Sequence, residues 1–389
     1  MENILYEKTE DNSDKLYLCQ YVVCAGSNND PIGMSGLSHY IEHFVIHTVC
    51  NGIFPAEIKI HGFTSFYYTC YYWYASTRER GIELFNVFDK SLEYLKSGNY
   101  NQEIFMGTKQ EIINEIRNRK SSNEELEDVV NLLNDKVQNL RLPIGIEDEI
   151  TRIQFEDISK HLGMQYKFDN IFRYIYDRTF KVFLYKEGVC NRVKIKLEDN
   201  IREVLKSANS VRQESNACVL VKEGVHKNKI KILIKYDLDS DLINIMLKEI
   251  FVTHICEYLQ RKTVNNNNVT YENLIVDRNV SFIVITVHEI GIQEFERILT
   301  EESLISWKTF INHLDVNSYN KIVCSLKTYL LDYNLENMTE KDVLLGMISY
   351  AAFEYPSIWL LENRNDAVKF LDELSYEQYW TFVNSMLDI

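Results

Sequence analysis

The spacing of hydrophobic residues along this chain switches between two periods, one typical of strands and one typical of helices. Residues 16–25 (LYLCQYVVCA) are β-branched and aromatic enough for a buried strand. Residues 26–36 are a polar loop that contains glycine, and residues 37–49 then have the apolar spacing of a helix, with Ser38 near its start. The run at residues 63–74 (FTSFYYTCYYWY) is dense in aromatic residues and threonine, which predicts another strand.

Helical spacing dominates the rest of the first half and recurs in the second. It predicts helices at residues 82–95, 102–119, 124–140 and 155–162, with a strand at residues 179–185. The second half has a strand at residues 229–236, a helix at 242–260, strands at 269–276 and 281–287, and helices up to residue 387. Because the order of strand, helix, strand and helices occurs twice, we predict two similar α+β domains.

One polar segment, residues 207–217 (SANSVRQESNA), has no periodicity and is our candidate linker. It would separate an N-terminal domain at residues 1–206 from a C-terminal domain at residues 218–389. A chain of 389 residues suits two domains of about 200 residues each.

Charge and hydropathy indicate which kinds of partner this chain does not bind. The chain has 42 Lys and Arg residues and 57 Asp and Glu residues, a formal charge of −15, which argues against nucleic acid and anionic membranes. No run of 18 apolar residues predicts a membrane span, and the N-terminal residues do not have the pattern of a secretory signal. We therefore expect a cytoplasmic protein that binds neither nucleic acid nor membrane.

Eight cysteines are scattered along the chain without a C-x-x-C pair. They occur at positions 19, 24, 50, 70, 190, 218, 256 and 324. Without a secretory signal, this pattern predicts reduced thiols. A cysteine hydrolase is an alternative class, since histidines are present, and it would be sensitive to alkylation and indifferent to chelators.

The strongest chemical signal is His39-Tyr40-Ile41-Glu42-His43, an H-x-x-E-H motif inside a predicted helix. Helical spacing places the two histidines and the glutamate on one face. Two neutral imidazoles can hold Zn²⁺, and the carboxylate can accept a proton from a metal-bound water. This order of residues is the signature of inverzincin peptidases.

A zinc site also needs a third protein ligand and an open position for water. The helix predicted at residues 102–119 carries Glu111 and Glu115, four positions apart and therefore on one face. An acidic residue from such a distant helix is a suitable third ligand. We assign His47, one turn beyond His43, to support or packing rather than to metal binding.

The residues around the motif form a longer pattern. It comprises Ala25-Gly26-Ser27, Gly36-Leu37-Ser38, residues 61–71, Ile112-Ile113-Asn114-Glu115-Ile116, Pro143-Ile144-Gly145 and residues 150–158. In these segments the chain resembles the pitrilysin and insulinase family of peptidases, which includes the mitochondrial processing peptidase. The family strand after the motif reads N-A-x-T-S-x-x-x-T-x-Y, and its third ligand lies in an I-x-x-E-I-like helix, here Glu115, 72 residues after His43.

The resemblance implies a set of roles for the motif residues. His39, His43 and Glu115 would bind one Zn²⁺ per chain, and Glu42 would be the general base. The implied activity is that of a zinc metalloendopeptidase, in which Glu42 assists the attack of zinc-bound water on a peptide bond. The implied fold is two homologous domains, each a mostly antiparallel sheet with helices on one side.

Substrate binding is also implied by the resemblance. Family members bind the peptide as an extra strand on a sheet edge, here lined by Thr64, Ser65 and Phe66. A second-half Arg and Tyr often grip the substrate, seven residues apart, with a glycine between them. The best match is Arg261 with Tyr271, which are ten residues apart and lack the glycine.

Two further departures from the family pattern affect the site. Where the family has another Glu two turns before the third ligand, this chain has Thr108 or Lys109, and Glu111 is the candidate that compensates or is simply solvated. His61 replaces the family's Asn at the substrate edge.

The resemblance also implies an assembly and a biological role. Relatives close a peptide-filled chamber with four such domains, so a chain with two implies a homodimer or a heterodimer with a related two-domain subunit. Bacterial peptidases of this length include enzymes that trim leader peptides from ribosomally made, modified peptides (bacteriocin maturation is one such role). Exopeptidase activity is another possibility. The alternative from a different class is a non-catalytic partner or scaffold subunit of the same fold.

Overall fold

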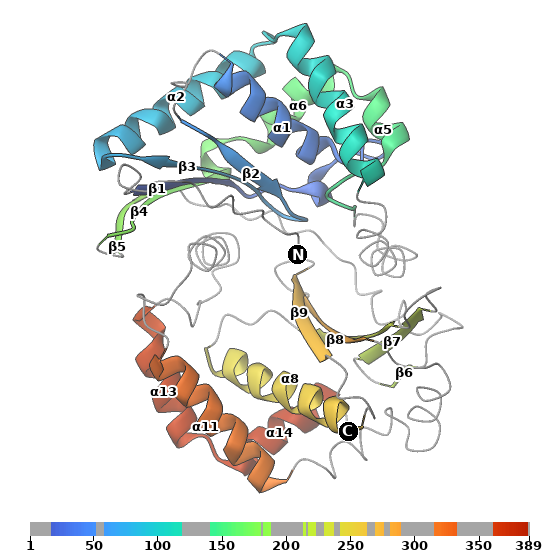
Figure 1. The fold of residues 1–389 in the computed structure, drawn as a ribbon, viewed down its shortest axis with the longest axis vertical. Helices are drawn as coiled ribbons and strands as arrows, with labels where there is room; N and C mark the ends of the chain where they lie inside the picture. The colour runs from blue at the N-terminus through green and yellow to red at the C-terminus, as the bar shows by residue number, and fades with distance from the viewer. Residues whose placement is uncertain are drawn as a thin grey trace. The chain divides into compact units, whose positions relative to one another are not determined.

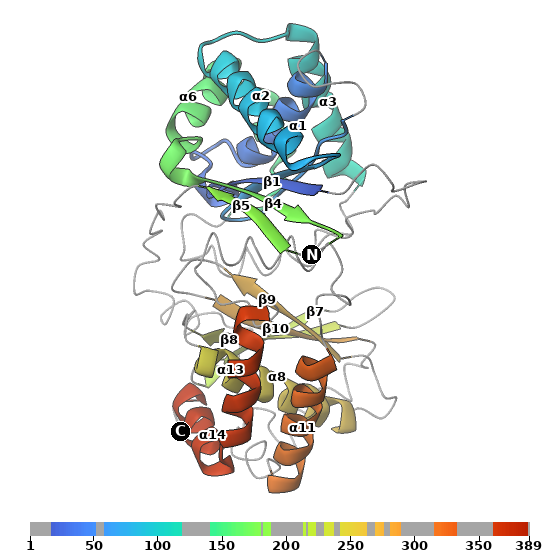
Figure 2. The same ribbon diagram turned by 90° about the vertical axis from the view of Figure 1, so that its left-hand side faces the viewer.

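The computed structural model describes residues 17–51, 58–118, 141–179, 182–187, 213–214, 217–222, 229–236, 242–262, 269–275, 281–288, 315–332 and 361–387. These residues form two compact units, one from Tyr17 to Glu187 and one from Gln213 to Leu387 (Figures 1 and 2). The helix predicted at residues 124–140 lies outside the described residues, as do residues 207–212, 215 and 216 of the predicted linker.

The sheet of the first unit is antiparallel, and the strand that follows the H-x-x-E-H helix lies at one edge of it. Its strands are β1 (Tyr17–Val23), β2 (His61–Thr64), β3 (Thr69–Ala75), β4 (Ile171–Asp177) and β5 (Val182–Glu187). The order across the sheet is β2-β3-β1-β4-β5, which places β2 at one edge of the described sheet.

The strand predicted at residues 63–74 is in fact two strands, β2 and β3, joined by a tight turn. The Ser65 N–H donates to the carbonyl of Tyr68 across this turn, at 2.8 Å. The single-strand prediction was wrong because aromatic residues fill the turn, which has none of the Gly, Pro or Asn residues that usually mark one. The prediction also missed β4, whereas the strand expected at residues 179–185 is confirmed, slightly shifted, as β5.

Helices cover one face of this sheet (Figure 1). They are α1 (Leu37–Cys50), α2 (Arg78–Lys96), α3 (Gln102–Asn118), α5 (Glu147–Arg152) and α6 (Phe155–Gln165), with short 3₁₀ turns η2 (Ser27–Asn29) and η3 (Phe168–Asn170). The helices predicted at residues 37–49, 82–95, 102–119 and 155–162 are confirmed as α1, α2, α3 and α6, while α5 was not predicted.

The core of the first unit lies between the sheet and these helices. Alternate residues of β1, among them Tyr21, point into it, as the period of a strand requires. Tyr21 packs against Phe88 of α2, with ring centroids 4.8 Å apart. The apolar side of α1, including Ile41 and Phe44, is buried in the same core. Burial of this side fixes the rotation of α1 about its axis and so determines where the motif side chains point.

The second unit has the same layer arrangement. Its strands are β6 (Gln213–Glu214), β7 (Ala217–Lys222), β8 (Lys229–Tyr236), β9 (Val269–Ile275) and β10 (Ser281–His288), in the antiparallel order β6-β7-β8-β10-β9. Its described helices are α8 (Leu242–Lys262), α11 (Val316–Asp332), α13 (Leu361–Glu373) and α14 (Tyr376–Leu387). The predictions for β8, α8, β9 and β10 are confirmed, and the predicted linker contains β6.

Two further sequence-based expectations concern thiols and membranes. Cys19, Cys50, Cys70, Cys256 and Cys324 carry free thiols, but Cys24 is disulfide-bonded. The expectation of reduced thiols is therefore wrong for Cys24, because a disulfide depends on which cysteines the fold brings together and not on their spacing along the chain. Among the described helices, none combines the length and the hydropathy needed to cross a membrane.

Candidate metal centre

The first turn of α1 is held in place by two glycines and one buried carboxylate. Gly36, at the N-cap of α1, and Gly145 both have positive φ, and a Cβ added to Gly36 would lie 2.6 Å from the Cα of Gly145. Asp30 accepts hydrogen bonds from the N–H groups of Gly36 and Ser38, each at 2.8 Å, and from the Ser38 hydroxyl at 2.6 Å. This carboxylate caps the helix immediately before His39.

Burial dominates the electrostatics of this cap. It raises the pKa of Asp30 to about 7, although the hydrogen bonds from Ser38 and Gly36 and the charge of Arg141 act in the opposite direction. His161 of α6 lies on the other side of the cap, with Nε2 3.3 Å from the Ser38 hydroxyl. Burial lowers the pKa of His161 to about 4, so this imidazole is neutral in the folded chain near neutral pH.

The three motif side chains come together on one face of α1, as the spacing predicts. The metal-binding atoms of His39, Glu42 and His43 all lie within 4.8 Å of one another. His39 and Glu42 are buried, and His43 is partly exposed. A carboxylate that is only 3% exposed beside two imidazoles is placed for chemistry with a ligand rather than with bulk solvent.

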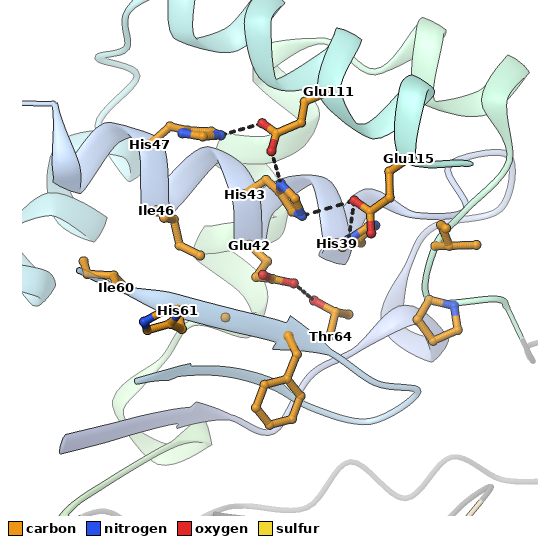
Figure 3. A pocket seen from close by; sticks show the side chains of 14 residues that line it. His39, Glu42, His43, Ile46, His47, Ile60, His61, Thr64, Glu111 and Glu115 are labelled. Atoms are coloured by element: carbon orange, nitrogen blue, oxygen red, sulfur yellow. Dashed lines mark hydrogen bonds and ion pairs between the residues drawn. The ribbon is translucent and has the colours of Figure 1, made fainter. Parts of the chain in front are cut away.

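A carboxylate from α3 completes the cluster. Glu115 Oε2 lies 3.7 Å from Nε2 of His39 and 3.6 Å from Nε2 of His43 (Figure 3). Two atoms bound at about 2.1 Å to a tetrahedral zinc lie roughly 3.4 Å apart, so this donor set and its spacing fit a zinc ion. The structure therefore brings together the predicted ligands His39, His43 and Glu115 around the predicted base Glu42.

The approach of α3 to α1 is secured by one buried tyrosine. The Tyr40 hydroxyl donates to the carbonyl of Phe105 at 2.5 Å, and the two rings pack with centroids 5.6 Å apart. Phe44, one turn along α1, packs edge to face on the same Phe105 ring. These contacts hold together the two helices that carry the predicted ligands.

Glu111, the alternative third ligand from the sequence, contacts two histidines of α1. Its carboxylate lies 3.4 Å from Nδ1 of His43 and 2.6 Å from Nε2 of His47. Burial lowers the pKa of His43, but the hydrogen bond that the ring donates to Glu111 and the charges of Glu42, Glu115 and Glu111 outweigh it and raise that pKa to about 9. The hydrogen bonds to His43 and His47 hold the pKa of Glu111 well below its usual range.

The edge strand β2 contributes the opposite wall. The Thr64 hydroxyl donates to Oε2 of Glu42 at 3.0 Å (Figure 3). A Cβ added to Gly62 would lie 2.6 Å from Oε1 of the same carboxylate. This close approach was missed from the sequence, although glycine inside a strand is a signal of it. The carboxylate of Glu42 is thus held between α1 and β2.

Ser65 and Phe66 lie in the turn after β2 rather than on the strand. The carbonyl of Ser65 accepts from the N–H of Ser27 at 3.0 Å, and that of Phe66 accepts from the N–H of Asn28 at 2.9 Å. Of the three predicted edge residues, the structure brings only Thr64 to the cavity beside the motif. His61, on the strand itself, stacks on Tyr72 with ring centroids 5.0 Å apart.

The motif, Glu115 and β2 line a cavity of about 370 Å³. Its wall also includes Pro143 and Ile144, from the loop that ends at Gly145. The segment that interrupts the helical pattern in the sequence therefore contributes to the site.

The remaining predicted site residues lie elsewhere. Thr108 of α3 is buried, and its hydroxyl has no hydrogen-bond partner among the described residues, while the Lys109 ammonium donates to the carbonyls of Thr151 and Ile153. Arg261 and Tyr271 belong to the second unit, on α8 and β9. The Tyr271 hydroxyl donates to Glu249 at 3.0 Å. Their predicted role in substrate binding stays a prediction.

Comparison with known proteins gives matches in fold. No family model matches the sequence, and no curated protein matches it. The match to the periplasmic protease PqqL from Escherichia coli has a TM-score of 0.65 and 13% sequence identity, and it covers 96% of this chain and 44% of the PqqL chain. Pitrilysin has a TM-score of 0.63 and 12% identity, covering 97% of this chain and 42% of its own. A peptidase M16 inactive domain from Pseudomonas fluorescens has a TM-score of 0.63 and 10% identity, covering 95% of this chain and 89% of its own.

The chain therefore has the fold of the pitrilysin-type M16 peptidases, and its H-x-x-E-H residues lie together within that fold. The resemblance predicted from the sequence is confirmed. The chain spans less than half the length of PqqL and of pitrilysin.

Proposed function

We propose that the chain is a zinc-dependent endopeptidase that cleaves small, extended peptides. One observation carries the proposal: His39, His43 and Glu115 converge at zinc-binding distances beside the buried carboxylate of Glu42, inside a cavity bounded by an edge strand. Bound zinc would lower the pKa of a water molecule and polarise the peptide carbonyl.

Glu42 has the position that a general base requires. Thr64 holds Oε2 by a hydrogen bond of 3.0 Å, and Gly62 leaves space around Oε1. Glu42 would accept the proton of the attacking water on Oε1 and return it to the nitrogen of the leaving amine. Glu42 belongs to α1 and accepts a hydrogen bond from Thr64 of β2. The reaction would therefore take place beside the strand on which a peptide would lie.

The preference for extended peptides rests on β2. An edge strand can pair with an added strand through backbone hydrogen bonds, which gives affinity with little demand on sequence. A cavity of about 370 Å³ holds a short stretch of peptide rather than a folded protein. Unstructured leader peptides meet this requirement, and we keep them as the candidate substrate class.

For the assembly we propose a dimer. The chain covers less than half of PqqL, so two copies together, or this chain with a related subunit, would approach the full length of such a relative. The order strand, helix and hairpin occurs as β1, α1, β2, β3 in the first unit and as β8, α8, β9, β10 in the second. This repeat supports two homologous domains per chain.

The second candidate function is that of a non-catalytic partner subunit. The fold match to an inactive M16 domain from Pseudomonas fluorescens and the threonine at position 108 favour it. Against it, the three proposed ligands and the proposed base lie together in this chain.

Metal analysis combined with peptide cleavage distinguishes the two candidates. Zinc per chain would be measured by elemental analysis in the parent, Glu115→Ala and Glu42→Gln, and cleavage would be followed with a library of quenched fluorescent peptides. We expect about one zinc in the parent, loss of zinc in Glu115→Ala, and retained zinc without cleavage in Glu42→Gln. An absence of zinc after reconstitution of the parent, or cleavage by Glu42→Gln at the parental rate, would refute the peptidase.

A further inference from the structure

Glu111 lies between two histidines of α1 on the side of His43 that faces away from the cluster (Figure 3). Nε2 of His43 faces Glu115, at 3.6 Å, and Nδ1 faces Glu111, at 3.4 Å. The second oxygen of Glu111 lies 2.6 Å from Nε2 of His47. A continuous series of contacts therefore runs from His47 through Glu111 to the nitrogen of His43 that does not face Glu115.

This geometry has a general physical consequence for a metal-binding imidazole. When one ring nitrogen binds a metal, the other carries a proton, and a carboxylate that accepts this proton fixes both the tautomer and the orientation of the ring. Glu111 is exposed, so on its own its side chain would have several rotamers available. The contact with His47 selects the rotamer that reaches His43.

The same three residues admit a competing interpretation as a separate cation site, because their ligand atoms also lie within 4.8 Å of one another. That site would require His43 to bind one ion through Nε2 and a second through Nδ1. An imidazole can do so only after losing both ring protons, whereas a single zinc needs only the neutral ring. The orienting role needs no such change and uses the contacts as they stand.

We propose that Glu111 and His47 are positioning residues, through which this chain holds the His43 ring for zinc binding. The inference deepens the proposed function and rests on it. It also accounts for Thr108: the carboxylate support comes from position 111, one turn closer to Glu115, while the Thr108 hydroxyl is buried without a hydrogen-bond partner among the described residues.

Zinc affinity is the measurement that tests the inference, because it does not depend on a known substrate. The dissociation constant would be determined by competition with a chromophoric chelator in the parent, Glu111→Ala, His47→Ala and His47→Gln. We expect Glu111→Ala to bind zinc roughly 10- to 100-fold more weakly, in the range seen when such supporting carboxylates are removed. His47→Ala should lose less, and His47→Gln, whose amide can donate to Glu111, should recover most of that loss.

A control variant and a spectroscopic measurement distinguish a positioning role from a general effect on the fold. Glu103→Gln, on an exposed position of the same helix, removes a charge from α3 away from the cluster and should leave the dissociation constant unchanged. Cobalt substitution gives a visible spectrum that reports ligand geometry, and we expect it to change in Glu111→Ala but not in Glu103→Gln.

The outcomes separate failure of the inference from failure of the proposed function. Parental zinc affinity in Glu111→Ala overturns the inference and leaves the proposed function standing. A parent that binds no zinc overturns both. Two zinc ions per parent chain, reduced to one in His47→Ala, would assign Glu111 and His47 to an ion of their own and also overturn the inference. Equal losses in His47→Gln and His47→Ala would remove His47 from it.

Discussion

The hydrogen bond between Thr64 and Glu42 allows a sharp test of the site. The Thr64 hydroxyl is the donor, and it lies 3.0 Å from Oε2 of a carboxylate that is only 3% exposed. Replacing Thr64 with valine removes the hydroxyl and keeps the shape and the β-branched character of the side chain, which suit a strand. The change therefore removes one interaction of the proposed base and little else.

The expected magnitude follows from the charge of the acceptor. A hydrogen bond to a charged group contributes about 1.5–3 kcal/mol. If this contribution is lost from the transition state, each 1.36 kcal/mol lowers the rate tenfold, so kcat should fall roughly 10- to 150-fold. Zinc content should remain that of the parent, since the Thr64 hydroxyl donates to the proposed base Glu42, which is not one of the three proposed ligands.

The assay compares Thr64→Val with Thr64→Ser, which keeps the hydroxyl. Steady-state cleavage of one quenched fluorescent peptide gives kcat and KM, and elemental analysis of the same samples gives zinc per chain. We expect Thr64→Ser to stay near the parent and Thr64→Val to lose kcat with KM little changed.

Two results would refute this reasoning. If Thr64→Val cleaves the peptide as fast as Thr64→Ser, the hydroxyl does not support the base. If Thr64→Val loses zinc in proportion to its loss of activity, the residue maintains the whole site and not the position of Glu42.

Three further predictions concern the packing around the site. Tyr40→Phe removes the hydroxyl that joins α1 to a backbone carbonyl of α3, so the free energy of unfolding should fall by about 1–3 kcal/mol in urea denaturation, and an unchanged value would contradict the contact. Gly62→Val places a side chain where a Cβ is already 2.6 Å from Oε1 of Glu42, so cleavage should slow by roughly 100-fold; Gly107→Val, at a position with nothing within 4 Å, is the control and should cleave normally. Because burial lowers the pKa of His161 to about 4, the stability that its neutral form contributes is complete above about pH 6.5 and is lost as the pH falls to about 4, by about 3 kcal/mol. The difference in unfolding free energy between the parent and His161→Gln should therefore shrink over this range, and a difference independent of pH would show that His161 titrates normally.

Local patterns in the sequence determined the elements and the motif. A helix places residues i, i+3 and i+4 on one face whatever surrounds it, so the H-x-x-E-H spacing was sufficient to bring His39, Glu42 and His43 together. Apolar periodicity was sufficient for α1, α2, α3 and α8, because each of these helices buries apolar residues in the core of its unit. The assignment of Glu115 needed the resemblance to a family, since spacing alone could not separate it from Glu111 on the same face of α3.

Contacts between distant segments were decided only by the tertiary structure. The turn between β2 and β3 has no Gly, Pro or Asn, so its position depends on pairing with the neighbouring strand and on the hydrogen bonds that Ser65 and Phe66 accept from the loop before α1. The approach of Gly62 to Glu42 and the placement of Glu111 against His43 and His47 depend on how closely β2 and α3 lie to α1. The distance between α1 and α3 depends on side chains packed between elements far apart in sequence, such as Tyr40 on Phe105, and no local pattern encodes it.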